Sequence, residues 1–290
     1  MKVIHFLINS NIFIALAAVS LALATDAQLG IAPHFKTYLV VIFLATLSDY
    51  NLHRFIAVKN NPKARHVEKL LWAVKYLQLL KILILTSSTG LVISLFFIRI
   101  EILFVLLPLA LLSFLYSIPF PGNLKKPFQL LGIPGMKTLL IALVWTAVTV
   151  FLPVIQSGTP VNQASVLLIF AERFTFIFAI AIPFDIRDIK ADALAGMKTI
   201  PATFGEKQAL LVCNSSMILS FMIASFHYLL QNMAFIFIAY FVSVGLTLVF
   251  INSRKIKGYP LYYHGILDGS ILLHGLLISL GFFLFNCLTL

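Results

Sequence analysis

The sequence has few charged side chains for its length. Charged residues make up 11% and hydrophobic residues 61% of its 290 positions, whereas an ordinary soluble domain has roughly 25% and roughly 45–50%. A soluble fold of this size needs a polar surface, and 21 basic and 10 acidic residues that occur in clusters are too few to cover one. The composition therefore excludes a soluble protein and indicates that apolar surface faces lipid.

Cysteine and linker sequences are also scarce. Cys213 and Cys287 lie in separate apolar segments without the spacing of metal ligands, so the sequence predicts neither a zinc site nor a disulfide framework. No stretch of Gly, Ser and Pro is long enough to separate two domains, and we predict one domain over residues 1–290. The first apolar segment, residues 3–25, lacks a cleavable signal pattern and is predicted to be a retained helix.

Long apolar segments fill most of the chain. A membrane-spanning helix needs roughly 20 mostly apolar residues. This rule gives nine candidates, which begin near Val3, Phe35, Leu79, Ile100, Lys137, Ser165, Gln208, Ala234 and Ile266. We therefore predict an all-α polytopic membrane protein, a single bundle of about nine transmembrane helices.

Basic residues occur in short runs between these segments. A net charge of +11 is compatible with nucleic-acid binding, but with nine spans all basic residues except Lys36, Arg99 and Arg173 fall on one side. The positive-inside rule explains this distribution better and makes that side cytoplasmic. We expect no nucleic-acid partner, a cytoplasmic N-terminus, a C-terminus on the opposite side and a location in a bacterial inner (plasma) membrane.

Acidic side chains concentrate in a cytoplasmic segment after the sixth predicted span. Asp185, Asp188 and Asp192 are spaced i, i+3 and i+7, which places them on one face of a helix. Three stacked carboxylates repel one another unless a cation or water compensates. Mg²⁺ binds one or two carboxylates together with substrate phosphate oxygens and would compensate. The alternative is a solvated surface segment whose acids pair with the basic residues among them.

Residues 185–205, DIRDIKADALAGMKTIPATFG, resemble the second Asp-rich motif of the UbiA superfamily of intramembrane prenyltransferases. The shared features are the spaced aspartates, the following Lys-Thr-Ile-Pro and the closing Phe-Gly. A weaker similarity lies at residues 115–119, LYSIP, followed by Lys125 and Lys126, which resemble a Tyr-Ser-x-Pro and Lys segment after the fourth span of that family. Nine spans with both Asp-rich loops cytoplasmic are typical of the family and agree with the topology above.

This resemblance implies Mg²⁺-assisted transfer of a polyprenyl group from its diphosphate to an acceptor, commonly an aromatic quinone precursor. Asp185, Asp188 and Asp192 would hold Mg²⁺ against the diphosphate, and the metal with basic side chains would neutralise the charge that develops as the allylic C–O bond breaks. The candidates for diphosphate binding are Arg187, Lys198, Lys125, Lys126 and Tyr116. An apolar cavity rich in the 27 Phe residues would hold the isoprenoid tail, and its aromatic faces would stabilise the allylic cation.

The first Asp-rich motif of that family, Asn-Asp-x-x-Asp-x-x-x-Asp after the second span, is not intact here. The chain has TLSDYNLHRFIAVKNNP at residues 46–62. Asp49 is kept, but the other aspartate positions hold residues such as Leu52, His53, Ile56 or Ala57. Half of the metal site that the resemblance implies is therefore missing.

A polar cluster nevertheless remains at this position. We take Asp49, Asn51 and Arg54 as the candidate catalytic residues. Arg54 would contact phosphate directly where the family uses a bridging Mg²⁺, because a guanidinium binds phosphate in bidentate fashion. His53 acts either as a base or as a helix cap.

Other polar residues lie inside predicted spans. Asp268 and His274 are six residues apart and not on one helical face, so we predict a polar contact in the membrane interior and no dyad. Residues 9–11, Asn-Ser-Asn, either face the cavity or hydrogen-bond between helices.

The leading hypothesis is a divergent UbiA-like prenyltransferase whose partners are a polyprenyl diphosphate and a small aromatic or lipid acceptor. The first alternative is a non-catalytic relative that binds or moves an isoprenoid lipid and tolerates Asp188→Asn. The second is a secondary transporter, which predicts inverted repeats with broken spans at corresponding positions. The sequence contains no such pair.

Overall fold

The computed structural model describes residues 2–31, 36–60, 70–117, 133–194 and 197–289. These ranges are helical, and no strand occurs within them. The elements in chain order are α1 (Lys2–Asn9), α2 (Ile12–Gln28), α3 (Thr37–Asn60), α4 (Leu71–Lys75), α5 (Leu77–Leu95), α6 (Glu101–Ser117), α7 (Met136–Ser157), α8 (Gln163–Leu194), α9 (Ile200–Phe204), α10 (Glu206–Leu230), α11 (Ala234–Asn252), α12 (Arg254–Lys257), the π-helix η4 (Tyr262–Leu267) and α13 (Asp268–Thr289). The predicted all-α fold class is confirmed.

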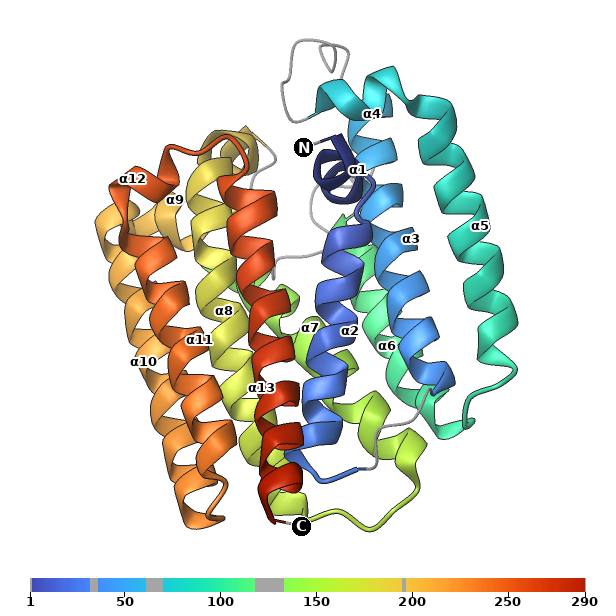
Figure 1. Cartoon of the computed structure of the whole chain (residues 1–290). Helices are drawn as coiled ribbons and strands as arrows, with labels where there is room; N and C mark the ends of the chain where they lie inside the picture. The colour runs from blue at the N-terminus through green and yellow to red at the C-terminus, as the bar shows by residue number, and fades with distance from the viewer. Residues whose placement is uncertain (1, 32–35, 61–69, 118–132, 195–196, 290) are drawn as a thin grey trace.

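The long helices run from one end of the molecule to the other (Figure 1). Among the described residues, seven helices are long and apolar enough to cross a membrane: α3, α5, α7, α8, α10, α11 and η4 continued by α13. The bent pair α1 and α2 is an eighth span if it is counted once, and α6 is a shorter apolar helix of 17 residues. Each of the nine predicted segments thus corresponds to a helix. The count of nine spans is reached only if the bent pair α1–α2 is counted as one span and the shorter helix α6 as another.

The two chain ends lie at opposite ends of the bundle (Figure 1). The short helices α4, α9 and α12 gather at the N-terminal end, which α12 supplies with three basic residues, Arg254, Lys255 and Lys257. The position of the two chain ends at opposite ends of the bundle is the one that an odd number of spans requires. That the N-terminal end faces the cytoplasm stays a prediction.

A break between α1 and α2 bends the first span by 76°. Asn11 adopts a left-handed backbone conformation there, with φ of 62°, and its amide donates to Asn51 Oδ1 at 3.0 Å. The Asn51 amide in turn donates to the carbonyl oxygens of Ser10, at 3.0 Å, and Leu47, at 2.8 Å. Of the two predictions for residues 9–11, the structure therefore supports hydrogen bonding between helices. It also gives Asn51 a structural role, because each of its polar atoms is used.

Two of the three basic residues that the sequence assigns to the far face are buried. Lys36 lies 3.5 Å from Asp26 Oδ1, and Arg173 is 1% exposed in α8. The Arg173 guanidinium donates to groups on α2 and α7, namely Leu21 O, Thr25 Oγ1, Gln28 Oε1 and Thr149 O. Arg173, which the sequence assigns to the side opposite most basic residues, is therefore buried inside the bundle, where partners from other helices satisfy its charge.

Glu172, the neighbour of Arg173, is also fully buried. Its carboxylate accepts hydrogen bonds from Gln28 Nε2, at 2.7 Å, and from the hydroxyl of Tyr228. Nearby, His274 pairs with Ser243 at 2.6 Å and does not pair with Asp268 in any described contact. These polar contacts connect α2 with α8 and α10, and α11 with α13, inside an otherwise apolar core.

Helices α2 and α13 approach so closely that Gly275 has no room for a side chain. A Cβ at this position would lie 2.4 Å from the backbone carbon and from the hydroxyl of Ser20. Small residues permit such approaches between membrane helices, where dispersion contacts replace the hydrophobic effect as the driving force. A Cβ at Gly245 on α11 would meet no atom of the described residues within 4 Å, so this glycine offers a matched comparison.

We expect Gly275→Val to destabilise the bundle by about 1–3 kcal/mol, because backbone atoms must shift to admit the side chain. The apparent melting temperature of the purified protein in detergent should fall, and the same substitution at the open position, Gly245→Val, should leave it unchanged or raise it. Equal melting temperatures for Gly275→Val and the wild type would contradict the close contact between α2 and α13.

Candidate active site

The segment with the three aspartates continues α8 as a helix beyond the predicted span. Asp185 and Asp192 are 2% and 4% exposed, and both contact the ammonium group of Lys137 in the first turn of α7. Lys137 Nζ lies 3.1 Å from Asp185 Oδ1, and 3.0 and 2.8 Å from the two oxygens of Asp192. Thr138 also donates to Asp185. The i, i+7 spacing does place these two carboxylates on one face, and that face lies against α7.

Asp188 points to a different neighbour. The Arg187 guanidinium donates to both of its carboxylate oxygens, from Nε at 3.0 Å and from Nη2 at 2.8 Å. Arg187 Nη1 lies 3.1 Å from His264 Nε2, and His264 Nδ1 lies 3.3 Å from Asp268 Oδ2. A row of alternating charged and polar groups therefore connects α8 with η4 and α13, and the three aspartates do not share one cation.

Aromatic rings hold the Arg187 side chain. Its guanidinium lies 5.1 Å from the centre of the Phe184 ring and 4.8 Å from that of Tyr263. His264 and Tyr263 belong to η4, and single turns of π-helix are frequent at functional sites. Sequence reasoning missed His264, whose available signal was its i, i+4 spacing to Asp268 near the start of an apolar span.

The candidate residues on α3 divide into two groups. His53 Nε2 lies 3.2 Å from Asp49 Oδ1, and the Ser113 hydroxyl of α6 donates to the same oxygen at 3.2 Å. Arg54 donates to the carbonyl oxygen of Asn9. The charges of Asp268 and Arg187 also act on Arg54.

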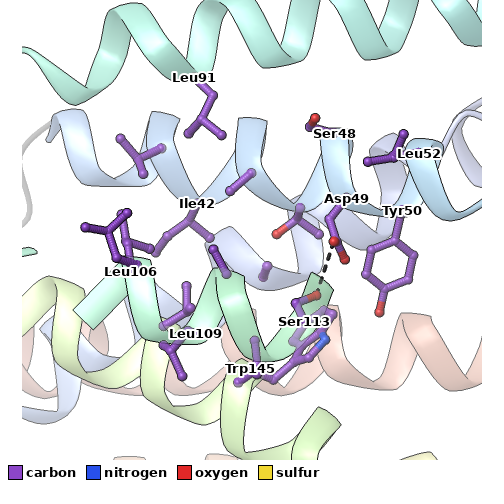
Figure 2. A pocket seen from close by; sticks show the side chains of 18 of the residues that line it. Ile42, Ser48, Asp49, Tyr50, Leu52, Leu91, Leu106, Leu109, Ser113 and Trp145 are labelled. Atoms are coloured by element: carbon purple, nitrogen blue, oxygen red, sulfur yellow. Dashed lines mark hydrogen bonds between the residues drawn. The ribbon is translucent and has the colours of Figure 1, made fainter. Parts of the chain in front are cut away.

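An apolar cavity of about 390 Å³ lies among α2, α3, α5, α6 and α7. Figure 2 shows Asp49, Tyr50 and Ser113 beside Trp145, while Ile42, Leu106 and Leu109 line the cavity farther from them. The Tyr50 and Trp145 rings meet edge to face, with centroids 6.4 Å apart. The expected Phe-rich lining is not found: the described residues around the cavity are mainly Leu, Ile, Val and Ala.

For the four other predicted diphosphate ligands, the described part of the chain shows no contact of the side chain with the residues above. Lys125 and Lys126 lie outside the described residues, and so does the side chain of Tyr116, whose backbone belongs to the last turn of α6. Lys198 precedes α9 and has an exposed side chain, while its carbonyl oxygen accepts a hydrogen bond from the Gly135 amide at 3.1 Å. In the described part of the chain, the predicted catalytic residues Asp49 and Arg54 lie on α3, whereas Arg187 lies on α8 beside His264.

The chemical environment of the carboxylates decides whether they can serve together as ligands of Mg²⁺. Asp185 and Asp192 share Lys137, and Asp188 is held by Arg187. In the described part of the chain, no group of three or more His, Cys, Asp or Glu side chains is arranged to hold a metal ion. In this arrangement the three aspartates do not fit a common Mg²⁺ site, and the predicted metal role stays a prediction.

Comparison with known proteins identifies similar sequences and folds. The model of the UbiA prenyltransferase family matches residues 72–259. The structure is similar to that of a UbiA homolog from Archaeoglobus fulgidus, with 16% identity and a TM-score of 0.63 over 94% of this chain and 98% of that chain. The same homolog bound to DMAPP and Mg²⁺ gives 14% identity and a TM-score of 0.60, again over 94% and 98%.

A UbiA homolog from Aeropyrum pernix K1 has 17% identity and a TM-score of 0.59 over 92% of this chain and 97% of that chain. No curated protein matches the sequence. The similar structures establish the fold, and the family match covers well over half of the sequence. The chain therefore belongs to the UbiA prenyltransferase family.

Proposed function

We propose that this protein is an intramembrane prenyltransferase that moves a prenyl group from a prenyl diphosphate to a small aromatic or lipid acceptor, as in the biosynthesis of quinones or related lipids. The observation that carries the proposal is a juxtaposition on α3. Arg54, on which the charges of Asp268 and Arg187 act, is close along the helix to Asp49 and His53, which line the apolar cavity. A site for an anionic group thus adjoins a site for a hydrocarbon chain.

The diphosphate is proposed to bind between Arg54 and Arg187. Both side chains are planar forks that match phosphate oxygens, and Arg187 is oriented by Phe184 and Tyr263. Because Arg187 is paired with Asp188 in this structure, the diphosphate would replace part of that pairing. His264 lies beside Arg187 and would donate when protonated. Lys198, Lys125, Lys126 and Tyr116 remain proposed additional diphosphate ligands.

The isoprenoid tail is proposed to occupy the cavity among α2, α3, α5, α6 and α7. Its aliphatic lining favours a hydrocarbon chain, because burial of each CH₂ group contributes about 0.8 kcal/mol. When the allylic C–O bond breaks, the electron pair leaves with the diphosphate, where the guanidinium groups stabilise the charge. The faces of Tyr50 and Trp145, at the polar end of the cavity, would stabilise the allylic cation.

The acceptor then attacks the allylic carbon and loses a proton. Asp49 and His53 form an i, i+4 pair that lines the cavity, and the carboxylate would orient the imidazole and stabilise it when it takes this proton. Asp49 and Arg54 thus keep their proposed roles in the reaction. Asn51 is proposed to have a positioning role: its hydrogen bonds fix the break between α1 and α2, and it does not contact the reacting atoms.

Similar proteins support the class of donor. The Archaeoglobus fulgidus homolog was solved with DMAPP and Mg²⁺ and with GPP and Mg²⁺. A divalent cation is accordingly a proposal for this chain too, although the observed pairing of Asp185, Asp188 and Asp192 with side-chain cations leaves its ligands undefined.

The proposal is tested by diphosphate release from labelled geranyl diphosphate, with a panel of aromatic and lipid acceptors, with and without Mg²⁺. We expect release by the wild type, and a loss of about 10²-fold in kcat/KM for Arg187→Gln, because a charge stabiliser of the leaving group is removed. Arg254→Gln, an exposed arginine of α12, is the matched control and should keep wild-type activity.

Two results would contradict this assignment. Equal release by Arg187→Gln and the wild type would remove Arg187 from the diphosphate site. Binding of geranyl diphosphate without release, with every acceptor, would favour the non-catalytic alternative, in which the chain binds or moves an isoprenoid lipid.

The cavity should set the preferred length of the donor. Ala45 lines it, so Ala45→Phe should fill part of the volume and favour dimethylallyl over geranyl diphosphate by about tenfold, a change of about 1.4 kcal/mol. Ala234→Phe, at an exposed position that begins α11, is the control and should leave the ratio of kcat/KM values unchanged. An unchanged ratio in Ala45→Phe would place the tail elsewhere.

A further inference from the structure

Lys137 has an unusual environment for a basic residue at the end of a membrane helix. Its side chain is 17% exposed, and those of Asp185 and Asp192 are 3% and 5% exposed. A lysine ammonium has three donors and no acceptor, and Nζ lies within 3.1 Å of three carboxylate oxygens. The whole donor capacity of Lys137 is therefore directed to two buried aspartates.

The backbone around Lys137 is fixed by separate contacts. Gly135 precedes α7 with φ of 80°, and its amide donates to Lys198 O at 3.1 Å. A Cβ at Gly135 would lie 2.9 Å from the Ile200 side chain. On the other side of Lys137, Thr138 donates to Asp185. The start of α7 is thus held against α8 and α9 in a position from which the ammonium reaches both aspartates.

Electrostatics explains why a cation is needed there. Two carboxylates removed from water without a counter-charge cost several kcal/mol, and a single ammonium reduces their formal charge from −2 to −1. A divalent metal ion would supply positive charge through the same oxygen atoms. Lys137 and a divalent cation therefore compete for one position.

We propose that Lys137 is a built-in cation of the Asp185–Asp192 pair and keeps this pair from binding a divalent metal ion. The pair then acts as an internal salt bridge between α7 and α8, and any metal that accompanies the diphosphate is held by other groups. This inference rests on the proposed function only in one respect: the proposed prenyl transfer is the reason to expect a divalent metal ion near Asp185 and Asp192. Its test uses no prenyl substrate, so it can fail while prenyl transfer is confirmed, and the reverse is also possible.

The test is Mn²⁺ binding by the full-length protein in detergent, followed through the electron paramagnetic resonance signal of free Mn²⁺ without diphosphate. We expect the wild type to bind weakly at this pair, with Kd on the order of 10⁻³ M. Lys137→Met keeps the length of the side chain but removes the charge, and should gain one site that is at least about tenfold tighter. The double variant Lys137→Met with Asp192→Asn should lose that site.

Lys207→Met, at an exposed position in α10, is the control and should bind Mn²⁺ like the wild type. Equal affinity in Lys137→Met and the wild type would overturn the proposal. If Lys137→Met does not fold, wild type and Asp192→Asn decide: equal weak binding supports the proposal, and tight wild-type binding that Asp192→Asn abolishes overturns it.

Discussion

The neutralisation of buried charge by partners within the chain is the constraint on which this structure depends. Lipid supplies no hydrogen bonds, so a carboxylate or guanidinium inside the bundle needs a partner from a neighbouring helix. Lys137 meets this need for Asp185 and Asp192 and fixes α7 to α8. The Arg173 guanidinium finds its partners on α2 and α7. These contacts connect α8 with α7 and with α2 through polar groups inside an otherwise apolar bundle.

The same constraint determines what is available for chemistry. Asp185 and Asp192 are occupied by Lys137, whereas Arg187 is paired with Asp188 and also approaches His264. Basic side chains of α8 and η4 are therefore in contact, and Arg54 of α3 is close along its helix to residues that line the aliphatic cavity. An anionic head on a hydrocarbon chain, as in a prenyl diphosphate, has the two properties that this arrangement complements.

Much of the fold follows from the sequence, because lipid-facing helices need long apolar segments and each predicted segment became a helix. The helical spacing predicts one face for Asp185, Asp188 and Asp192; Asp185 and Asp192 do share a partner there, whereas Asp188 pairs with Arg187. Partners distant in sequence were not predictable: Lys137 resembles an ordinary basic flank, and only the packing of α7 on α8 shows its contact with the aspartates. Arg173 was misplaced for the same reason. The α1–α2 break likewise depends on Asn51, which is forty residues from Asn11.

A prenyl diphosphate is proposed to bind with its head at Arg54 and Arg187 and its tail in the aliphatic cavity. The most direct measurement is an experimental structure of the protein with a non-reactive geranyl thiodiphosphate. The account predicts phosphorus positions within hydrogen-bonding reach of both guanidinium groups and a hydrocarbon chain that passes Trp145. A diphosphate bound away from these arginines, or a chain outside the cavity, would contradict it.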